Sequence, residues 1–154
     1  MEKNPLSVAL KKLSYHSYSK KEMEKRLIIL EYSKEEIADV VAKLLDWGYL
    51  NDSKLALYFY EYYTNIKPCG YFYIKNKLIE KGIPQEIIDS VLTNYDQDEE
   101  YIVAKRVSEK FLNNKEYDMS SVTIKGKLAR CLNRKGFSNS TILKVLSDNF
   151  NEIS

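Results

Sequence analysis

Apolar residues recur at the spacing of helix faces, and one arrangement of them occurs three times along the chain. When three segments of the chain are aligned on Tyr32, Ile83 and Phe137, five further positions are apolar in all three segments. These positions are Met23/Ile74/Leu128, Leu27/Leu78/Leu132, Ile37/Ile88/Ile142, Val40/Val91/Val145 and Val41/Leu92/Leu146. Self-similarity of this kind predicts a repeat protein whose units stack to bury a continuous core.

A turn signal divides each repeat into two helices. Gly82 follows a helical run where a residue with positive φ commonly ends a helix, and Ile83 can pack back on Leu78. Pro84 is suited to begin the next helix. The same order returns at Gly136-Phe137-Ser138 and, less regularly, at Glu31-Tyr32-Ser33. We therefore predict that Gly82→Val and Gly136→Val each destabilise the chain by about 1 to 3 kcal/mol.

Capping signals place further helix ends. Ser19 with Glu22, and Ser33 with Glu36, each form a capping-box pattern, so we expect helices from there to about residues 30 and 45. A first helix is expected over residues 6–15, and Gly48 is a candidate helix end, followed by Asn51 or Asp52 as the next cap. One further helix is expected to begin near residue 52. It is followed by a pair of helices that is split at residue 82 and ends near residue 95. Another helix is expected through residues 103–111, and a last pair over residues 121–150 is split at residue 136.

Strand signals are nearly absent, which predicts an all-α fold. We expect three tandem three-helix, helix-turn-helix-like repeats over residues 1–50, 51–95 and 96–154, forming an elongated, curved array. The acidic run Asp96–Glu100 is expected to be the solvated start of a helix, where carboxylates favour the helix dipole.

Composition narrows the class of protein. With 154 residues, 44% hydrophobic and 30% charged, the chain can bury a core and stay in solution, and its net charge of +2 indicates no particular partner. No apolar run approaches the roughly 20 residues that span a bilayer, and the start lacks the apolar region of a signal peptide. Cys69 and Cys131 are expected to be reduced thiols of a cytoplasmic protein, with a disulfide as the weaker alternative.

Catalytic and cofactor motifs are missing from the sequence. His16 is the only histidine, so the usual His/Cys zinc site is not expected. Neither a glycine-rich phosphate loop nor a nucleophile elbow occurs. The many carboxylates alternate with lysines as on ordinary helix surfaces, so we expect no enzyme activity, no metal and no cofactor.

Positive charge is concentrated in the third repeat. From Tyr101 to Asp148 there are ten Lys or Arg residues against four Asp or Glu. Lys127, Arg130 and Arg134 lie at helical spacing, which predicts a basic stripe for contact with phosphate or an acidic protein groove; an ordinary solvated face is the equal alternative. The candidate partner- or DNA-binding residues are Lys75, Lys77, Lys81, Lys125, Lys127, Arg130, Arg134 and Lys135.

Tyrosine is abundant, with thirteen in the chain. The segments Tyr58–Tyr63 and Tyr71–Tyr73 could stack bases of single-stranded DNA. Half-buried helix faces with their hydroxyls in water are the interpretation we favour.

Three groups of residues together resemble the RecX family of bacterial regulators that act on the RecA recombinase. The first is Leu13 with Ser19, Glu22, Met23 and Leu27; the second is Gly48-Tyr49-Leu50-Asn51-Asp52, Ala56, Gly70, Leu78 and Lys81-Gly82-Ile83; the third is Ala104, Leu128, Leu132 and Arg134-Lys135-Gly136-Phe137-Ser138. The resemblance covers nearly the whole chain. Where the family usually has arginines before the first capping serine, this chain has Tyr15-His16-Ser17-Tyr18.

The resemblance implies a non-catalytic interaction module. It would bind the groove of a RecA–DNA filament and lower ATP hydrolysis, strand exchange and repressor self-cleavage, and so act in DNA repair, recombination and the SOS response. Direct contact with single- or double-stranded DNA, a monomeric state and no membrane association are further expectations. A helix-turn-helix transcription regulator is the main alternative, and a scaffold for an unrelated protein is a third.

Overall fold

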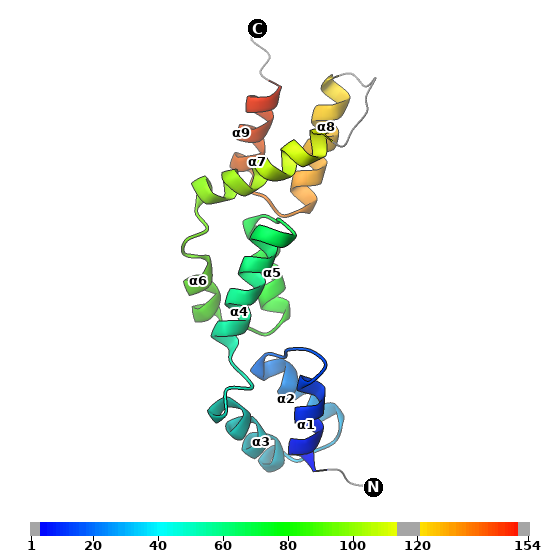
Figure 1. Cartoon of the computed structure of the whole chain (residues 1–154), viewed down its shortest axis with the longest axis vertical. Coiled ribbons are helices and arrows are strands. Elements are labelled where there is room, and N and C mark those ends of the chain that lie inside the picture. The colour runs from blue at the N-terminus through cyan, green and yellow to red at the C-terminus, as the bar shows by residue number, and fades with distance from the viewer. Residues whose placement is uncertain (1–3, 114–120, 151–154) are drawn as a thin grey trace. The chain divides into compact units, whose positions relative to one another are not determined.

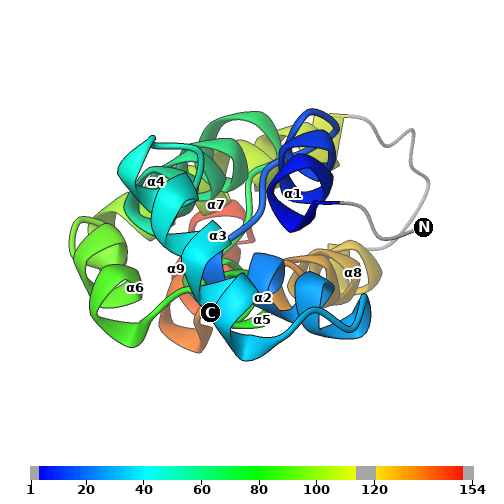
Figure 2. The ribbon, with the colours of Figure 1, turned by 90° about the horizontal axis from the view of Figure 1, so that it is seen from below.

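Every regular element in the described part of the chain is helical. The computed structural model describes residues 4–113 and 121–150, in which the ribbon shows coils and no strand from either of two directions (Figure 1 and Figure 2). The prediction of an all-α fold is confirmed. The elements are α1 Pro5–Leu13, α2 Lys20–Ile29, α3 Lys34–Asp46, α4 Asp52–Glu61, the π-helical turn η1 Tyr62–Ile66, α5 Tyr71–Glu80, α6 Gln85–Leu92, α7 Gln97–Asn113, α8 Ser121–Arg134 and α9 Asn139–Asn149.

The chain forms two compact units, each made of segments that are distant in sequence. The first contains the described residues up to Tyr58 together with Leu78–Val91. The second contains Phe59–Lys77 and the described residues from Leu92 onward. The sequence predicts three repeats with boundaries at 50/51 and 95/96, which is a different division of the chain from these two units. These boundaries, and the elongated, curved shape, stay predictions.

In the first unit, α3 packs against both α1 and α2. Both capping boxes predicted there are confirmed, because the Ser19 and Ser33 hydroxyls each accept the amide of the glutamate three residues on, at 3.1 Å. Asn51, rather than Asp52, caps α4 by accepting the Lys54 amide at 3.0 Å. The core of the three helices consists of Ala9, Tyr18, Met23, Leu27, Ile37, Val40, Val41, Leu44 and Leu50.

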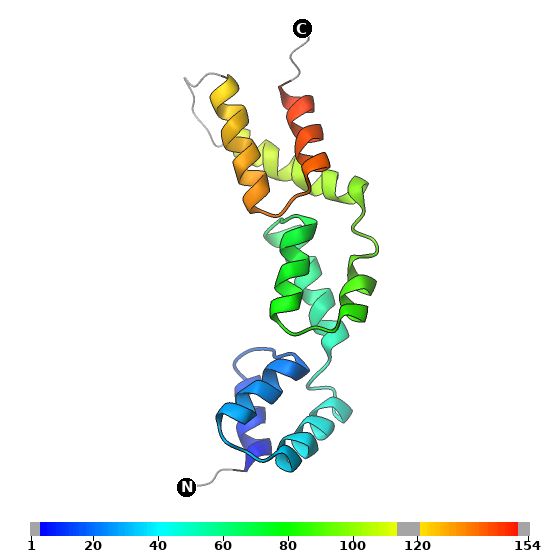
Figure 3. The ribbon, with the colours of Figure 1, turned by 180° about the vertical axis from the view of Figure 1, so that it is seen from behind.

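The second unit is organised by α7, which runs across α8 and α9 and contacts both (Figure 3). Val103 and Ala104 on α7 are almost fully buried, as are Leu128 and Leu132 on α8.

The same turn ends four of the helices. In each, the amide of an apolar or aromatic residue donates to the carbonyl five positions earlier, and the residue before it has positive φ. This arrangement satisfies carbonyls that the helix end leaves without a partner. The four bonds are Tyr32 to Leu27, Tyr49 to Leu44, Ile83 to Leu78 and Phe137 to Leu132, and the positive φ angles are 67° at Glu31, 80° at Gly48, 79° at Gly82 and 83° at Gly136.

The aligned apolar positions lie in the core, as predicted. All are buried except Tyr32 and Val91, which are half-buried. The two sets nearest the turn, Met23/Ile74/Leu128 and Leu27/Leu78/Leu132, are 0% exposed throughout. Leu30, which follows α2, and Leu45, in the last turn of α3, are 45% and 41% exposed.

The expectation that the whole acidic run 96–100 is solvated is wrong at Glu100. This residue is 3% exposed. Its carboxylate accepts the Tyr71 amide at 2.9 Å and the hydroxyls of Ser138 and Thr141, each at 2.6 Å. A buried carboxylate is tolerated here because several donors, two of them at helix starts, replace its water. Glu100 therefore fixes the starts of α5 and α9.

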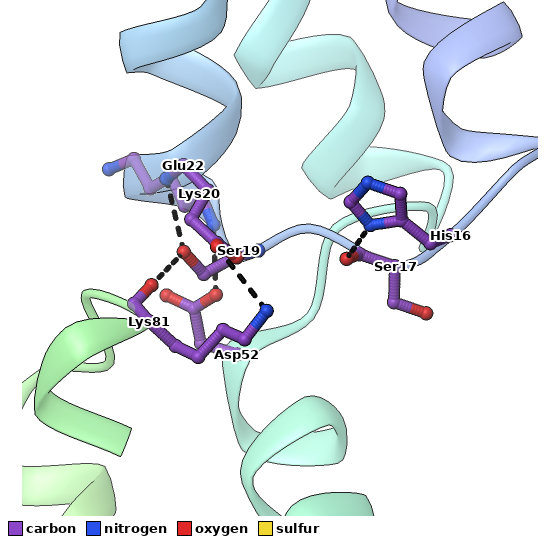
Figure 4. A network of polar contacts seen from close by, with 7 residues as sticks. All are labelled: His16, Ser17, Ser19, Lys20, Glu22, Asp52 and Lys81. Atoms are coloured by element: carbon purple, nitrogen blue, oxygen red, sulfur yellow. Dashed lines mark hydrogen bonds and ion pairs between the residues drawn. The ribbon is translucent and has the colours of Figure 1, made fainter. Parts of the chain in front are cut away.

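In each unit, the end of one helix meets the start of another. In the first unit, the Ser19 hydroxyl donates to the carbonyl of Lys81 at the end of α5, and the Lys20 amide donates to Asp52 at 2.9 Å (Figure 4). In the second unit, the Gly70 amide donates to the Lys135 carbonyl at 2.8 Å, and the Phe72 amide to that of Gly136 at 3.0 Å. Such pairing satisfies orphan groups at both helix ends and brings opposite ends of their dipoles together.

Candidate nucleic-acid and partner interface

Helix α8 carries a cationic face without compensating carboxylates. Its segment up to Lys135 contains five Lys or Arg residues and no Asp or Glu. Leu128 and Leu132 are fully buried, whereas Arg130 and Arg134 are exposed and Lys127 is half-buried. Among the residues the structure describes, none of these five cations forms an ion pair. They are Lys125, Lys127, Arg130, Arg134 and Lys135.

The lysines predicted on α5 and its end have different surroundings. Lys75 and Lys77 are half-buried, and the Lys77 ammonium lies 5.7 Å from the centre of the Tyr73 ring. Lys81 belongs to the first unit, where its ammonium lies 3.5 Å from the Glu22 carboxylate. Lys81 therefore already has a structural partner.

An open hollow lies in the second unit where the end of α8 meets the start of α5. It has a volume of about 280 Å³ and is lined by Lys67, Cys69, Tyr73, Cys131, Arg134 and Lys135. Gly70 and Gly136 allow this close approach: a Cβ on Gly70 would lie 2.4 Å from the Gly136 carbonyl oxygen, and one on Gly136 would lie 2.4 Å from the Tyr73 nitrogen. Only residues without a side chain fit at such distances.

The charged side chains that line the hollow are all positive. Burial raises the pKa of the Cys69 thiol, and the charges of Lys135, Lys67 and Lys77 partly oppose this rise. Cys69 and Cys131, far apart in the sequence, both line the hollow and both are free thiols, so the expectation of reduced cysteines is consistent with the structure.

An aromatic cluster borders the hollow. The Tyr63 ring lies 6.2 Å from Phe59, 5.0 Å from Tyr62 and 5.2 Å from Tyr73, measured between ring centres. All four rings are half-buried. Burial, and then its neighbour Tyr73, raise the pKa of Tyr63 above its ordinary value.

The π-helical turn positions this cluster. The Thr64 hydroxyl donates to the Tyr60 carbonyl at 2.8 Å, Arg106 donates to the Thr64 carbonyl at 3.0 Å, and the Cys69 amide closes the segment on the Tyr63 carbonyl at 2.8 Å. The sequence did not predict this turn. The density of aromatic residues favoured half-buried rings over base stacking, and the rings are half-buried, but this density did not indicate a π-helical turn.

Other kinds of site were not found in the described ranges. They contain no group of three or more His, Cys, Asp or Glu side chains that could hold a metal ion. Within the same residues, no helix is both long enough and apolar enough to cross a membrane.

A family model, curated relatives and solved structures that are similar to this chain share the description RecX. Residues 6–44 match the family model described as "RecX, first three-helix domain". A regulatory protein RecX from Pelodictyon phaeoclathratiforme is 32% identical over 141 residues, which are 92% of this chain and 86% of that protein. The chain belongs to the RecX family. The resemblance seen in the sequence is thereby confirmed.

Further RecX relatives show both the fold and a difference in length. The RecX of Bacillus cytotoxicus is 32% identical over 91% of this chain but only 52% of its own length, so the chain spans about half of this relative. The crystal structure of RecX from Lactobacillus salivarius superposes with a TM-score of 0.78 at 28% identity and covers 94% of this chain and 93% of that one. A second RecX crystal structure, 24% identical with a TM-score of 0.77, is similar in fold.

Proposed function

We propose that this chain is a non-catalytic regulator that binds in the groove of the RecA–DNA filament and lowers its ATP hydrolysis, strand exchange and coprotease activity. Membership of a family of regulatory proteins named RecX carries the proposal. The unpaired cations of α8 support it, because a filament that contains DNA presents phosphates and acidic side chains. A cytoplasmic, monomeric protein acting in DNA repair and the SOS response is part of the same proposal.

The helix-turn-helix alternative has less support at the helices that would read bases. A recognition helix presents base-reading side chains from its N-terminal turn. The start of α6 carries Glu86, and the Gln85 side-chain Nε2 donates to the Asp89 carboxylate at 2.8 Å. At the start of α9, Ser138 is engaged by Glu100. These contacts leave few groups free to read a base edge.

The test measures filament binding and ATPase inhibition by the full chain. Lys127→Glu with Arg130→Glu reverses two charges of the α8 face and leaves Arg134 in place. We expect helicity and melting to change little, since Arg130 is exposed, Lys127 is half-buried without an ion pair among the described residues, and surface charges contribute little to stability. Co-sedimentation with RecA on single-stranded DNA, and inhibition of its ATP hydrolysis, should weaken at least tenfold at physiological salt and recover partly at low salt.

A matched control reverses two exposed charges of α7, Lys105→Glu with Lys110→Glu. It should keep the parent's inhibition. The acidic run Asp96–Glu100 is less suitable for a charge-reversal control, because Glu100 is buried. If the α8 variant folds and inhibits at the parent's concentration, the α8 face is not the contact surface. If the parent itself neither binds nor inhibits the filament, the proposed function is wrong.

A further inference from the structure

Gly126, in the interior of α8, is a glycine that the fold of the chain does not require. The other four glycines have a structural reason: three have positive φ, and a Cβ on Gly70 would lie 2.4 Å from the Gly136 carbonyl oxygen. Apart from its own helix backbone, a Cβ on Gly126 would meet only the Arg130 guanidinium, at the ordinary contact distances of 3.5 Å from Nη1 and 4.0 Å from Nη2. Glycine stabilises a helix interior less than alanine does, because it loses more backbone freedom on folding. The reason for Gly126 therefore lies outside the chain.

Val122, Gly126 and Arg130 form one row along the outside of α8, here called the α8 row. Residues four positions apart lie above one another on a helix, so these three share a face. Leu128, two positions beyond Gly126, lies on the opposite side and is fully buried. Val122 is 71% exposed and Arg130 is exposed. The α8 row thus faces away from the core that α8 forms with α7 and α9.

The shape and charge of the α8 row favour an acidic partner that comes very close. A helix without a side chain at the centre of its outer face allows another backbone to approach more closely. The Arg130 guanidinium lies beside this gap and can donate two parallel hydrogen bonds to a carboxylate. Lys125 and Lys127 lie on either side of Gly126, and the segment 121–135 contains no Asp or Glu that would repel an acidic partner.

The apolar end of the α8 row favours a protein over a phosphate backbone. Covering Val122 stabilises a complex when the partner brings an apolar side chain, which a phosphodiester strand lacks. Val122 and Arg130 are eight positions apart, or roughly 12 Å along the helix axis. A partner helix with an apolar residue and, about two turns away, an Asp or Glu matches this spacing.

We infer that the α8 row is a docking surface for an acidic helix of the RecA protein. The partner backbone passes over Gly126, its carboxylate binds Arg130, and its apolar side chain covers Val122. This inference rests on the proposed function and deepens it, because it assigns the α8 row to the protein component of the filament and not to the DNA.

Substitutions of Gly126 should change stability and binding in opposite directions. Gly126→Ala should raise the melting temperature by about 2 to 4 °C, since alanine is the better helix former and its methyl group has room. It should also raise the concentration for half-maximal inhibition of RecA ATP hydrolysis on single-stranded DNA about three- to tenfold, because the methyl group meets the partner backbone. Gly126→Leu should raise that concentration by more than about tenfold. Loss of folding cannot explain a variant that is more stable and inhibits less.

Two further variants separate bulk, charge and apolar contact. Ala42→Leu adds a large side chain at an exposed position of α3 and should keep the parent's inhibition. Val122→Ser should weaken inhibition about three- to tenfold, equally at low and at physiological salt, because salt does not screen an apolar contact. The loss caused by Lys127→Glu with Arg130→Glu should instead recover partly at low salt.

Binding of DNA alone decides which component of the filament meets Gly126. Fluorescence anisotropy of fluorescein-labelled dT15, without RecA, should give the same affinity for Gly126→Leu as for the parent. An equal loss for dT15 and for the filament would place a nucleic-acid backbone over Gly126 and overturn the inference. If Gly126→Leu does not fold, Gly126→Ala decides both measurements.

Failure of this inference is distinct from failure of the proposed function. Gly126 variants that inhibit the filament at the parent's concentration would overturn the docking surface, while the parent's inhibition would leave the proposed function standing. A parent that neither binds nor inhibits the filament would overturn both.

Discussion

Glycines with positive φ differ in what surrounds them, and this decides what a side chain costs. Gly48, Gly82 and Gly136 have nearly equal φ angles, between 79° and 83°. A Cβ on Gly48 would meet nothing within 4 Å, one on Gly82 would lie 2.9 Å from the Lys21 Cβ, and one on Gly136 would lie 2.4 Å from the Tyr73 backbone nitrogen. The Lys21 Cβ moves only with its own backbone, so a side chain at Gly82 requires a small shift of α2, whereas the much closer approach to a helix backbone atom at Gly136 requires a larger one.

We therefore predict a graded series of alanine variants. Gly48→Ala should lower the free energy of unfolding by about 1 kcal/mol, the cost of the left-handed conformation alone, and Gly136→Ala should lower it by about 3 kcal/mol or more. Gly82→Ala should fall between them. Urea unfolding monitored by circular dichroism measures all three. Equal losses would mean that the close approach at Gly136 contributes nothing.

Tyr95 predicts a pH dependence. It is 3% exposed and donates from its hydroxyl to the Cys69 carbonyl at 2.7 Å. Burial, and then the nearby Glu100 carboxylate, raise its pKa well above the ordinary value. A pKa that is higher in the folded than in the unfolded state means that the stabilisation is complete below about pH 10, the unfolded pKa, and is lost as the pH rises further.

The variant Tyr95→Phe separates the hydrogen bond from the titration. At pH 7 it should lose about 1 to 2 kcal/mol of unfolding free energy, because the bond to the Cys69 carbonyl is absent. Between pH 9.5 and 11 its stability should fall less steeply than the parent's. Parallel curves over that interval would show that Tyr95 does not cause the alkaline loss.

At the scale of elements, the sequence predicted what depends on near neighbours. The capping boxes of α2 and α3 join residues three apart, and the glycine turns join residues five apart, so both could be read directly. Glu100 could not, because its partners Tyr71 and Thr141 are 29 and 41 residues away. The hollow was missed for the same reason: Arg134 and Lys135 were predicted as binding residues, but nothing local indicated Lys67 and Tyr73 as their neighbours.

The two capping serines provide a matched comparison. Ser19 and Ser33 have the same capping-box geometry, but Ser19 is fully buried and also donates to the Lys81 carbonyl, whereas Ser33 is exposed. Ser33→Ala should cost about 1 kcal/mol, the usual value of a cap. Ser19→Ala should cost about 1 kcal/mol more, the net worth of one further hydrogen bond. Equal costs in thermal or urea unfolding would show that the bond to Lys81 does not stabilise the fold.

For the whole molecule, the repeats predict an extended monomer. Three units joined by short links should give a radius of gyration above the roughly 15 Å of a compact globule of this length. Small-angle scattering at micromolar concentration measures it. A compact value, or a stable dimer, would contradict the predicted array and leave the all-helical fold intact.

The bond between Ser19 and Lys81 also bears on the order in which the chain folds. It joins residues 62 positions apart, whereas the turns that end α2 and α5 close over five. Contacts at long sequence separation require more chain entropy to be lost before they form. The helix pairs should thus assemble first and this bond should form after the rate-limiting barrier. Its loss in Ser19→Ala, compared with Ser33→Ala, should then speed unfolding and leave the folding rate unchanged in stopped-flow measurements.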